Sequence, residues 1–316
     1  MQLSFLRKRP TVSVLVPVRD AALYVRDSLN SVLEQTFEDL EVIAIDDGSA
    51  DGSCDIIAEL ARTDKRVRFA RNRGSKGIAH ALNLGLAWAR GDYIGRMDAD
   101  DRARPTRIEK QLHYLRKNES IDLLGTNLEI IDANGNSLHL HQEPQGWLAV
   151  WFHTLFGTPF AHPSMLMRSS IFKTRKNRYR EVPAQDYDLW VRILNSRRRG
   201  DNLSEPLTMY RIHSQSDSHL RSAAHDDAAK IISAQQIGLY TPELRGSEVR
   251  PRFRLLGHCL VTNNFTFAES EDVNVGKLLS VALDRFLFKV QPSPQESLEF
   301  HNSFLTKLDQ HLQRLR

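Results

Sequence analysis

The chain has 316 residues, of which 41% are hydrophobic and 26% are charged, and its net charge is +4. This composition indicates a globular protein with a sizeable core and excludes a disordered or collagen-like chain. The charge is too small to indicate a nucleic-acid partner. The two cysteines, Cys54 and Cys259, cannot build a disulfide framework or a multi-cysteine zinc site, which suits a reducing compartment.

Membrane insertion and secretion are not expected from this sequence. No run approaches the ~20 apolar residues that cross a bilayer. The basic and apolar start of the chain is followed at once by Pro17, Arg19 and Asp20, without a small-residue cleavage site. We therefore expect a mature cytoplasmic chain rather than one with a signal peptide.

Short apolar segments alternate with segments of helical periodicity from Val12 onward. The expected strands are residues 12–16, 40–45, 67–70 and 93–97, and the expected helices are residues 23–35, 52–63 and 78–89. This alternation predicts crossover connections and a mostly parallel sheet. In such a sheet, ligands bind beyond the carboxyl ends of the strands.

The remainder of the chain has more varied patterns. The expected elements are a helix at 105–117, a hairpin with strands near 123–131 and 138–141, short helices within 146–215 around an extended stretch at 164–168, and helices beyond 222. Asn134-Gly135 supplies the hairpin turn. The sequence thus predicts an α/β fold with a helical C-terminal extension.

Two acidic clusters fall where predicted strands end. Asp98-Ala99-Asp100 follows the fourth strand, and an extended i, i+2 pair directs both carboxylates to one side, where they can bind one Mg²⁺ or Mn²⁺ ion. The alternative is a solvated turn that caps a helix. Asp46-Asp47-Gly48-Ser49 follows the second strand, and it is either a turn with a helix cap or a carboxylate site for a base or ribose.

Three further polar positions are candidates in the less regular half. Asp186 is either a helix cap or a general base, whereas Asp188 and Arg192 have the spacing of a helix-surface ion pair. His213 is either a packed loop histidine or the residue that completes a carboxylate metal site. The third position is His162, which opens the motif His162-Pro163-Ser164.

A basic segment and several aromatic residues admit two interpretations each. The segment from Arg168 to Arg180 has six basic residues and no acid, and it is either a solvated surface or a loop that faces a diphosphate or an anionic membrane. The aromatic residues, which either stack on sugars or form core, are Trp147, Trp151, Phe152 and Phe160. One helical face near the C-terminus carries Phe304, Leu308, Leu312 and Leu315. This face either packs on the catalytic domain or in a dimer, or it lies on a membrane.

Taken in order, these motifs resemble the family 2 glycosyltransferases, inverting enzymes of the GT-A fold, and in particular bacterial enzymes of surface-polysaccharide assembly. The resemblance covers residues 11 to 215. The matching segments are 12–18, 31–37, 46–52, 77–85, 91–101, 105–107, 162–164, 186–190 and 210–213. Each segment alone is moderately specific, whereas the ordered set is highly specific.

The resemblance implies the roles of the candidate residues. The expected nucleotide-sugar contacts are Pro17, Val18, Arg19, Asp20, Asp46, Asp47, Gly77, Asn83, Asp98 and Ala99, with Asp47 at the uracil. The expected ligands of a divalent cation (Mn²⁺ or Mg²⁺) are Asp98, Asp100 and His213, and the expected catalytic base is Asp186. It also implies a catalytic domain at 1–220, with a nucleotide-binding half at about 11–104 and an acceptor half at about 105–220, followed by a helical region at 221–316.

The implied reaction moves a sugar from a nucleotide diphosphate sugar, UDP-linked by expectation, to a saccharide or lipid-linked saccharide acceptor. Two positions depart from the family pattern: Arg19-Asp20 replaces the frequent Tyr-Asn, and Gln185 replaces an acidic neighbour of Asp186. They keep open an alternative, a catalytically impaired module that binds sugar nucleotide and acts as a scaffold. A dinucleotide dehydrogenase and a P-loop phosphotransferase are excluded because their glycine motifs are absent, and a pyrophosphorylase would begin with a Gly-rich basic loop.

Overall fold

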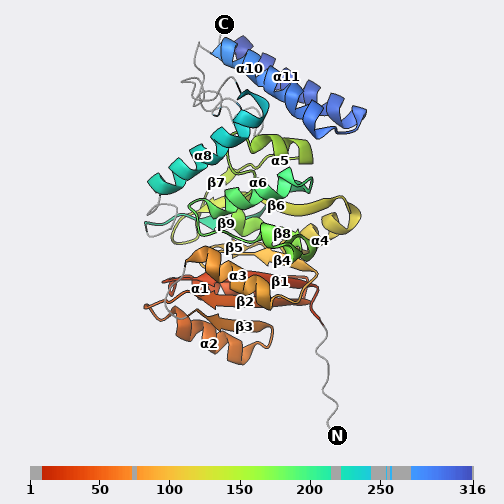
Figure 1. Ribbon diagram of the computed structural model, residues 1–316. Helices are drawn as coiled ribbons and strands as arrows, with labels where there is room; N and C mark the ends of the chain where they lie inside the picture. The colour runs from red at the N-terminus through yellow and green to blue at the C-terminus, as the bar shows by residue number, and fades with distance from the viewer. Residues whose placement is uncertain are drawn as a thin grey trace. The chain divides into compact units, whose positions relative to one another are not determined.

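A computed structural model describes residues 9–72, 77–214, 222–242, 254, 257 and 272–314 (Figure 1). The strands are β1 Val12–Val18, β2 Leu40–Asp46, β3 Val67–Arg71, β4 Tyr93–Arg96, β5 Arg102–Ala103, β6 Ile121–Ile131, β7 Ser137–His141, β8 Leu166–Arg168 and β9 Arg199–Arg211. The helices are α1 Val25–Leu33, α2 Ser53–Thr63, α3 Ile78–Trp88, α4 Arg107–Lys117, α5 Trp147–His153, α6 Gln185–Asn195, α8 Ser222–Tyr240, α10 Asp272–Val290 and α11 Pro294–Arg314.

The strands form one mixed sheet in the order β3-β2-β1-β4-β8-β6-β9-β5, and β7 pairs with β6. The first four strands of this order are parallel, and β8 and the hairpin strand β7 add antiparallel pairs. In β1, Val18 pairs with Asp46 and Leu15 pairs with Arg96, so the acidic segments after β2 and β4 leave the same edge of the sheet. This is the carboxyl edge, where α/β proteins bind ligands.

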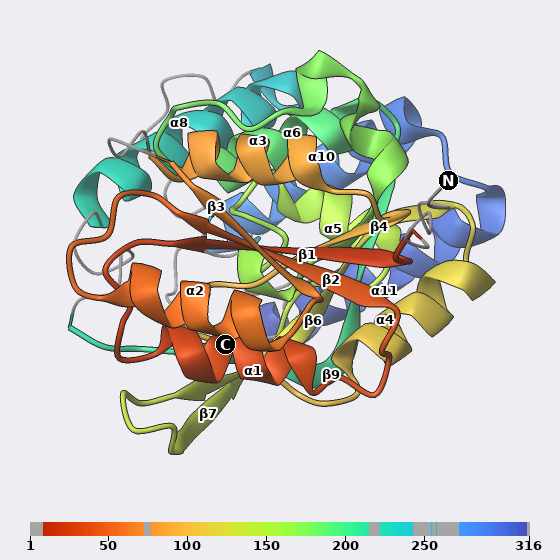
Figure 2. The same cartoon turned by 90° about the horizontal axis from the view of Figure 1, so that it is seen from below.

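The apolar runs of β1 and β2 are almost completely buried because helices cover both faces of the sheet. In Figure 2, α1 and α2 lie on one face of these strands and α3 lies on the other. Helix α3 approaches the sheet closely at Gly85, where an added Cβ would lie 3.0 Å from Ile45 and 3.1 Å from Leu15. A larger residue at this position would push α3 away from the strands.

The α/β class with C-terminal helices is confirmed, and most expected elements lie within two residues of their predicted bounds. Two expectations are wrong. Leu23 is 88% exposed and precedes α1, so it does not belong to the buried helix face. Residues 199–211 fall in the stretch expected to hold short helices around one extended segment at 164–168, but they form the long strand β9. β9 forms because it pairs with β6 on one side and with β5 on the other, where Met209 pairs with Arg102 and Thr208 with Ala103, a tertiary effect that local pattern does not reveal.

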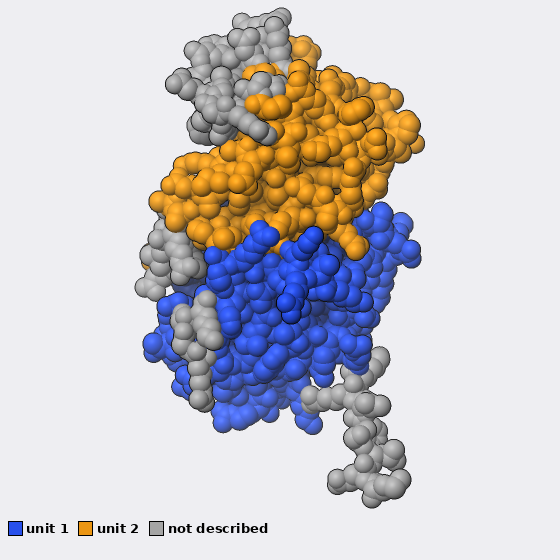
Figure 3. Space-filling model, in the orientation of Figure 1, with its two compact units in different colours: residues 1–141, 161–181, 205–213 blue, residues 142–160, 182–204, 214–316 orange. Residues whose placement is uncertain are grey.

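The chain divides into two compact units (Figure 3). Unit 1 comprises residues 1–141, 161–181 and 205–213 and contains the parallel strands. Unit 2 comprises residues 142–160, 182–204 and 214–316 and contains α5, α6, α8, α10 and α11. Within the described residues, none of the helices combines the length and apolar character needed to cross a bilayer.

An aromatic core holds unit 2 together. Phe152 of α5 is fully buried, and its ring centroid lies 5.1 Å from that of Phe286 in α10 and 5.4 Å from that of Phe304 in α11. Trp151 and Phe160 are also buried, so these residues are core rather than a sugar-stacking surface. The other residues of the predicted α11 face are Leu308, which is buried, and Leu312 and Leu315, whose side chains lie outside the described part.

Trp147, the remaining aromatic candidate, is half-buried and covered by polar groups of unit 2. The Arg199 guanidinium lies 3.9 Å from its ring centroid, and the indole N–H donates to Glu296. The hydrogen bond from Trp147 to Glu296 connects α5 to the start of α11. A cation–π contact of this kind is worth about 0.5–2 kcal/mol.

Candidate functional site

The acidic segment after β4 forms a turn in unit 1. The backbone N–H of Asp101 lies 3.4 Å from the carbonyl of Asp98, so Asp98 and Asp100 do not form the extended pair expected from the sequence. The turn replaces the strand because neighbouring side chains hold it. The Arg96 guanidinium, which is 1% exposed, donates to Asp98 Oδ1 at 2.5 Å, and Ser28 Oγ donates to the Asp98 carbonyl at 2.7 Å.

Asp100 meets His213 across the fold. Asp100 Oδ2 and His213 Nε2 are 3.0 Å apart, although 113 positions separate the two residues in the sequence. The His213 ring also lies 4.8 Å from that of Tyr24. Burial raises the pKa of Asp100, and the nearby charge of Asp98 raises it further. The two carboxylates are therefore close enough to repel each other, and a cation would relieve that repulsion.

These residues fit a divalent cation shared with a ligand rather than a fully protein-bound one. The described residues contain no cluster of three or more histidine, cysteine or acidic side chains arranged to hold a metal by themselves. Mg²⁺ in nucleotide sites is bound by one or two carboxylates, with phosphate oxygens and water completing the shell. Asp100 supplies such a carboxylate, Asp98 lies beside it, and His213 adds an imidazole nitrogen 3.0 Å from Asp100 Oδ2.

Asp101 lies behind this turn. It is 1% exposed, its Oδ1 accepts from the backbone N–H of Arg211 at 2.8 Å, and among the described residues its Oδ2 has no hydrogen-bond partner. Burial raises the pKa of Asp101 well above its usual value, and the charges of Asp100 and Asp98 add to that effect. Its only sequence signal was its place beside the Asp98–Asp100 pair, which did not indicate a role.

Asp46 and Asp47 lie at the end of β2, and both are buried. Asp47 accepts from Asn72 Nδ2 at 2.6 Å and from the backbone N–H of Gly77 at 3.0 Å, which joins the ends of β2 and β3 to the start of α3. Gly77 has φ +90°, and an added Cβ would lie 2.9 Å from the Glu181 carboxylate. Both features require glycine at this position. Asp46 Oδ1 accepts from the backbone N–H of Ser49 at 3.1 Å.

Asp20 joins the loop after β1 to the loop after β2. Its Oδ1 accepts from the backbone N–H of Ala50 at 2.8 Å, and its own N–H donates to Ser49 Oγ at 3.0 Å. Its φ is +47°, a left-handed conformation that aspartate tolerates better than most residues. Of the other expected nucleotide contacts, Val18 and Ala99 are buried, Pro17 is half-buried, and the Arg19 side chain is 51% exposed.

Asn83 makes backbone contacts that the sequence did not suggest. Its Nδ2 donates to the Tyr179 carbonyl at 2.8 Å, and its Oδ1 accepts from the Tyr179 N–H at 3.1 Å. The Tyr179 hydroxyl lies 2.9 Å from Nε2 of the buried His162. Burial lowers the pKa of His162 well below its usual value, and the charge of Arg96 lowers it further. Asn83 and His162 thus hold Tyr179, which lies near the end of the basic segment.

The basic segment combines structural and exposed residues. Arg168 donates from Nε to the Ile121 carbonyl at 3.0 Å and from Nη2 to the Leu115 carbonyl at 2.5 Å, and its guanidinium lies 5.6 Å from the Tyr93 ring centroid. The exposed members are Lys173, Arg175, Lys176 and Arg180.

Asp186 lies in unit 2, in the first turn of α6 rather than ahead of it. Its Oδ1 accepts from the backbone N–H of Tyr187 at 2.8 Å. The helix begins after Ala184, whose φ of +53° is unusual for a residue with a side chain. Asp188 and Arg192 form the expected ion pair at 2.7 Å.

Sequence comparison assigns the family. Residues 13–175 match the family described as glycosyl transferase family 2. A Haemophilus influenzae protein named uncharacterized glycosyltransferase is 34% identical over 243 residues, which are 73% of this chain and 74% of that protein. The Bacillus subtilis protein named putative glycosyltransferase EpsE is 34% identical over 67% of this chain and 76% of its own length. The Escherichia coli O-antigen biosynthesis glycosyltransferase WbnJ is 32% identical over 71% of this chain and 88% of its own length.

Solved structures have the same fold. S. aureus TarS 1-349 in complex with UDP-GlcNAc has a TM-score of 0.59 and 17% identity, over 96% of this chain and 89% of that chain. The mannosyltransferase PcManGT from Pyrobaculum calidifontis, in complex with GDP-Man and Mn²⁺, has a TM-score of 0.53 and 16% identity, over 97% and 88%. The chain belongs to glycosyltransferase family 2, has the GT-A fold, and is a glycosyltransferase that uses a nucleotide sugar.

Proposed function

We propose that this enzyme is a metal-dependent, inverting glycosyltransferase that moves a hexose from a UDP-linked donor to a glycan or lipid-linked oligosaccharide during surface-polysaccharide assembly. The observation that carries the proposal is the 3.0 Å approach of Asp100 and His213 beside Asp98, at the carboxyl edge of the parallel strands. The O-antigen biosynthesis for which WbnJ is named supports the acceptor class. The UDP-GlcNAc complex of TarS supports the donor class.

Asp100 and His213 would hold the cation, together with diphosphate oxygens. When bound, a divalent cation neutralises the negative charge that grows on a nucleoside diphosphate as it leaves. Arg96 fixes Asp98 by its ion pair, so Asp98 would orient the donor or complete the shell without moving. The Mn²⁺ in the PcManGT complex supports a metal in this role.

The loops after β1 and β2 would bind the nucleotide. Asp20 and Ser49 tie these loops together, and Asp47 is held by Asn72 and Gly77 at their inner side. A carboxylate fixed in this way keeps lone pairs that can accept the imide N–H of uracil. The remaining proposed contacts are Pro17, Val18, Arg19, Asp46, Asn83 and Ala99.

Asp186 would act as the general base. Its carboxylate would take the proton of the acceptor hydroxyl as that oxygen attacks the anomeric carbon. Attack on the face opposite the diphosphate inverts the anomeric configuration. The catalytic domain would comprise residues 1–220, followed by the helical region 221–316.

The experiment is nucleotide release from a panel of UDP- and GDP-sugars, with and without Mn²⁺, by the wild type and Asp100→Asn. We expect Mn²⁺-dependent UDP release that Asp100→Asn abolishes. Asp92→Asn is the matched control, because Asp92 is exposed at the opposite end of β4. Binding of UDP-sugars without release, in the presence of acceptor saccharides, would refute the enzyme proposal and support a scaffold.

A further inference from the structure

Arg211, the last residue of β9, makes an unusual set of contacts for an arginine whose side chain is only 4% exposed. Its Nε donates to the Asp100 carbonyl at 2.7 Å, and its backbone N–H donates to Asp101 Oδ1 at 2.8 Å. Its Nη2 lies 3.2 Å from Asp27 Oδ2 on α1. The side chain and the backbone of Arg211 therefore both hold the acidic turn.

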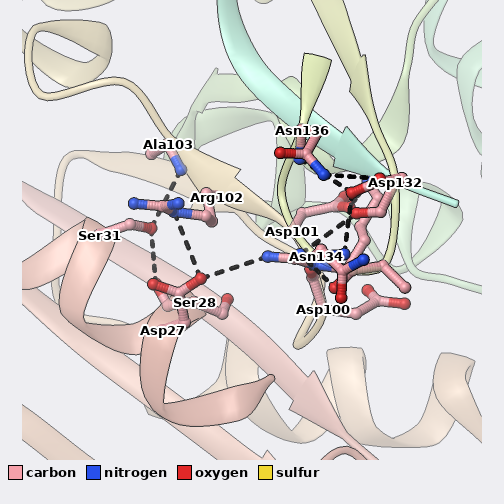
Figure 4. Close-up of polar contacts among 12 residues, drawn as sticks. Asp27, Ser28, Ser31, Asp100, Asp101, Arg102, Ala103, Asp132, Asn134 and Asn136 are labelled. Atoms are coloured by element: carbon pink, nitrogen blue, oxygen red, sulfur yellow. Dashed lines mark hydrogen bonds and ion pairs between the residues drawn. The ribbon is translucent and has the colours of Figure 1, made fainter. Parts of the chain in front are cut away.

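The third anchor of Arg211 is the loop between β6 and β7. Its Nη1 donates to the Ala133 carbonyl at 3.0 Å and lies 3.4 Å from the Asp132 carbonyl. This loop is itself fixed, because the Asp132 carboxylate accepts from the backbone N–H groups of Asn134 and Asn136 and from Asn136 Nδ2, each at 2.9 Å. Figure 4 shows the Asp132 loop, the Asp100–Asp101 turn and Asp27 on α1 as the parts of this network.

Tyr24 extends the network to His213. The Arg211 guanidinium lies 4.9 Å from the Tyr24 ring centroid, and the His213 ring lies 4.8 Å from the same ring. Arg211 therefore contacts the backbone of Asp100 directly and reaches His213 through Tyr24. One guanidinium thus connects to both residues of the Asp100–His213 pair.

We propose that Arg211 is the positioning residue of the cation site, and that it sets the distance between the Asp100 carboxylate and the His213 imidazole through the acidic turn and Tyr24. This inference rests on the proposed metal-dependent function. The planar guanidinium reaches three separated acceptors, the Asp100 carbonyl, the Asp27 carboxylate and the Ala133 carbonyl, at once. A lysine at this position keeps the charge, but its three N–H donors share one nitrogen and cannot reach all three acceptors.

The test is a titration of Mn²⁺, in the presence of UDP, followed by the electron paramagnetic resonance signal of free Mn²⁺. Loss of a residue that orients metal ligands weakens metal binding by about 10–100-fold, so we expect that loss in Arg211→Lys. Arg168→Lys is the matched control, because Arg168 also bridges backbone carbonyls and stacks on a tyrosine, Tyr93, but it does not contact the acidic turn. We expect wild-type Mn²⁺ affinity in Arg168→Lys.

Equal Mn²⁺ affinity in Arg211→Lys and the wild type would overturn the inference while leaving the proposed function intact. No Mn²⁺ binding by the wild type would overturn both. If Arg211→Lys does not fold by circular dichroism, Tyr24 provides the second comparison. Tyr24→Phe keeps the ring between Arg211 and His213 and should bind Mn²⁺ as the wild type does, whereas Tyr24→Leu should bind it more weakly, and equal affinity in these two variants would refute the inference.

Discussion

Asp100 Oδ2 and His213 Nε2 lie 3.0 Å apart and join the turn after β4 to the segment that follows β9. Burial and the charge of Asp98 disfavour the ionised form of Asp100 and raise its pKa. A cation bound at this pair would therefore stabilise the ionised carboxylate of Asp100. This relationship underlies the metal-dependent part of the account.

His213→Ala should increase the Mn²⁺ concentration needed for half-maximal nucleotide release. The reason is that His213 Nε2 lies 3.0 Å from Asp100 Oδ2 and would supply one of the ligands of the cation. His301→Ala is a matched control, since His301 forms a similar 3.1 Å pair with Asp284 in unit 2. An unchanged Mn²⁺ requirement in His213→Ala would show that His213 does not hold the cation with Asp100.

Asp186→Asn should lower kcat by about 10²–10⁴-fold, because one positioned general base contributes that much to the rate. The affinity for UDP should stay within about threefold, ~0.65 kcal/mol, because the proposed role begins after the donor has bound. Asp188→Asn, in the same helical turn, removes the carboxylate that pairs with Arg192 and should keep wild-type turnover. Steady-state transfer rates measure this, and an unchanged kcat in Asp186→Asn would remove Asp186 from the role.

Asp47→Asn should weaken UDP binding more than it lowers kcat. Asn72 Nδ2 and the Gly77 N–H both donate to the Asp47 carboxylate. The side-chain amide of an asparagine at position 47 would face one of these two donors with its own NH₂ group, so that one hydrogen bond is lost. One hydrogen bond that is lost with a buried donor left unpaired costs about 1–3 kcal/mol. Isothermal calorimetry with UDP measures the effect, and Asp55→Asn on the exposed side of α2 is the control. Wild-type UDP affinity in Asp47→Asn would contradict its place in the nucleotide pocket.

Glu41 predicts a pH dependence of stability in the parallel sheet. Burial alone would raise the pKa of Glu41, but hydrogen bonds from Arg90, Ser13 and Arg68 outweigh it and lower the pKa. A carboxyl whose pKa is lower in the folded protein stabilises the fold above its unfolded pKa of about 4.3, and that stabilisation is lost as the pH falls toward the folded pKa. The unfolding free energy should therefore drop on acidification below about pH 5.

Glu41→Gln should be less stable at pH 7 by about 1–3 kcal/mol, because it weakens the charge-assisted hydrogen bonds from Arg90 and Arg68, and its stability should vary less between pH 6 and pH 4. Urea denaturation at the two pH values measures both effects. Glu59→Gln is the control, since Glu59 forms a solvent-exposed pair with Arg26, and exposed pairs contribute little to stability. Equal pH dependence in Glu41→Gln and the wild type would contradict the assignment.

The sequence predicted the parallel half of the fold because its signals are local. The apolar runs of β1 and β2 and the polar residues that end them identify both the strands and the edge where ligands bind. β9 was missed because its pairing partners, β6 and β5, come from residues far along the chain. The candidate site was predictable only in part, because some of its contacts are also made between residues far apart in the sequence.

Side chains that bind backbone carbonyls have no sequence signature. Arg211 and Tyr24 escaped prediction because their contacts are with carbonyls and rings brought close by folding. Asn83 was expected at the nucleotide because of its motif, yet its amide bonds the backbone of Tyr179, a contact that only the folded chain reveals. The turn of Asp98 and Asp100 likewise depends on Arg96 and Ser28.

The central claim is tested most directly by calorimetric titration of UDP into the wild type and Asp100→Asn, with Mn²⁺ and with EDTA. If Asp100 holds the cation, Mn²⁺ strengthens UDP binding to the wild type by about tenfold or more, at least ~1.4 kcal/mol. The same increase in UDP affinity is absent in Asp100→Asn. Equal UDP affinity of the wild type with Mn²⁺ and with EDTA would contradict the central claim.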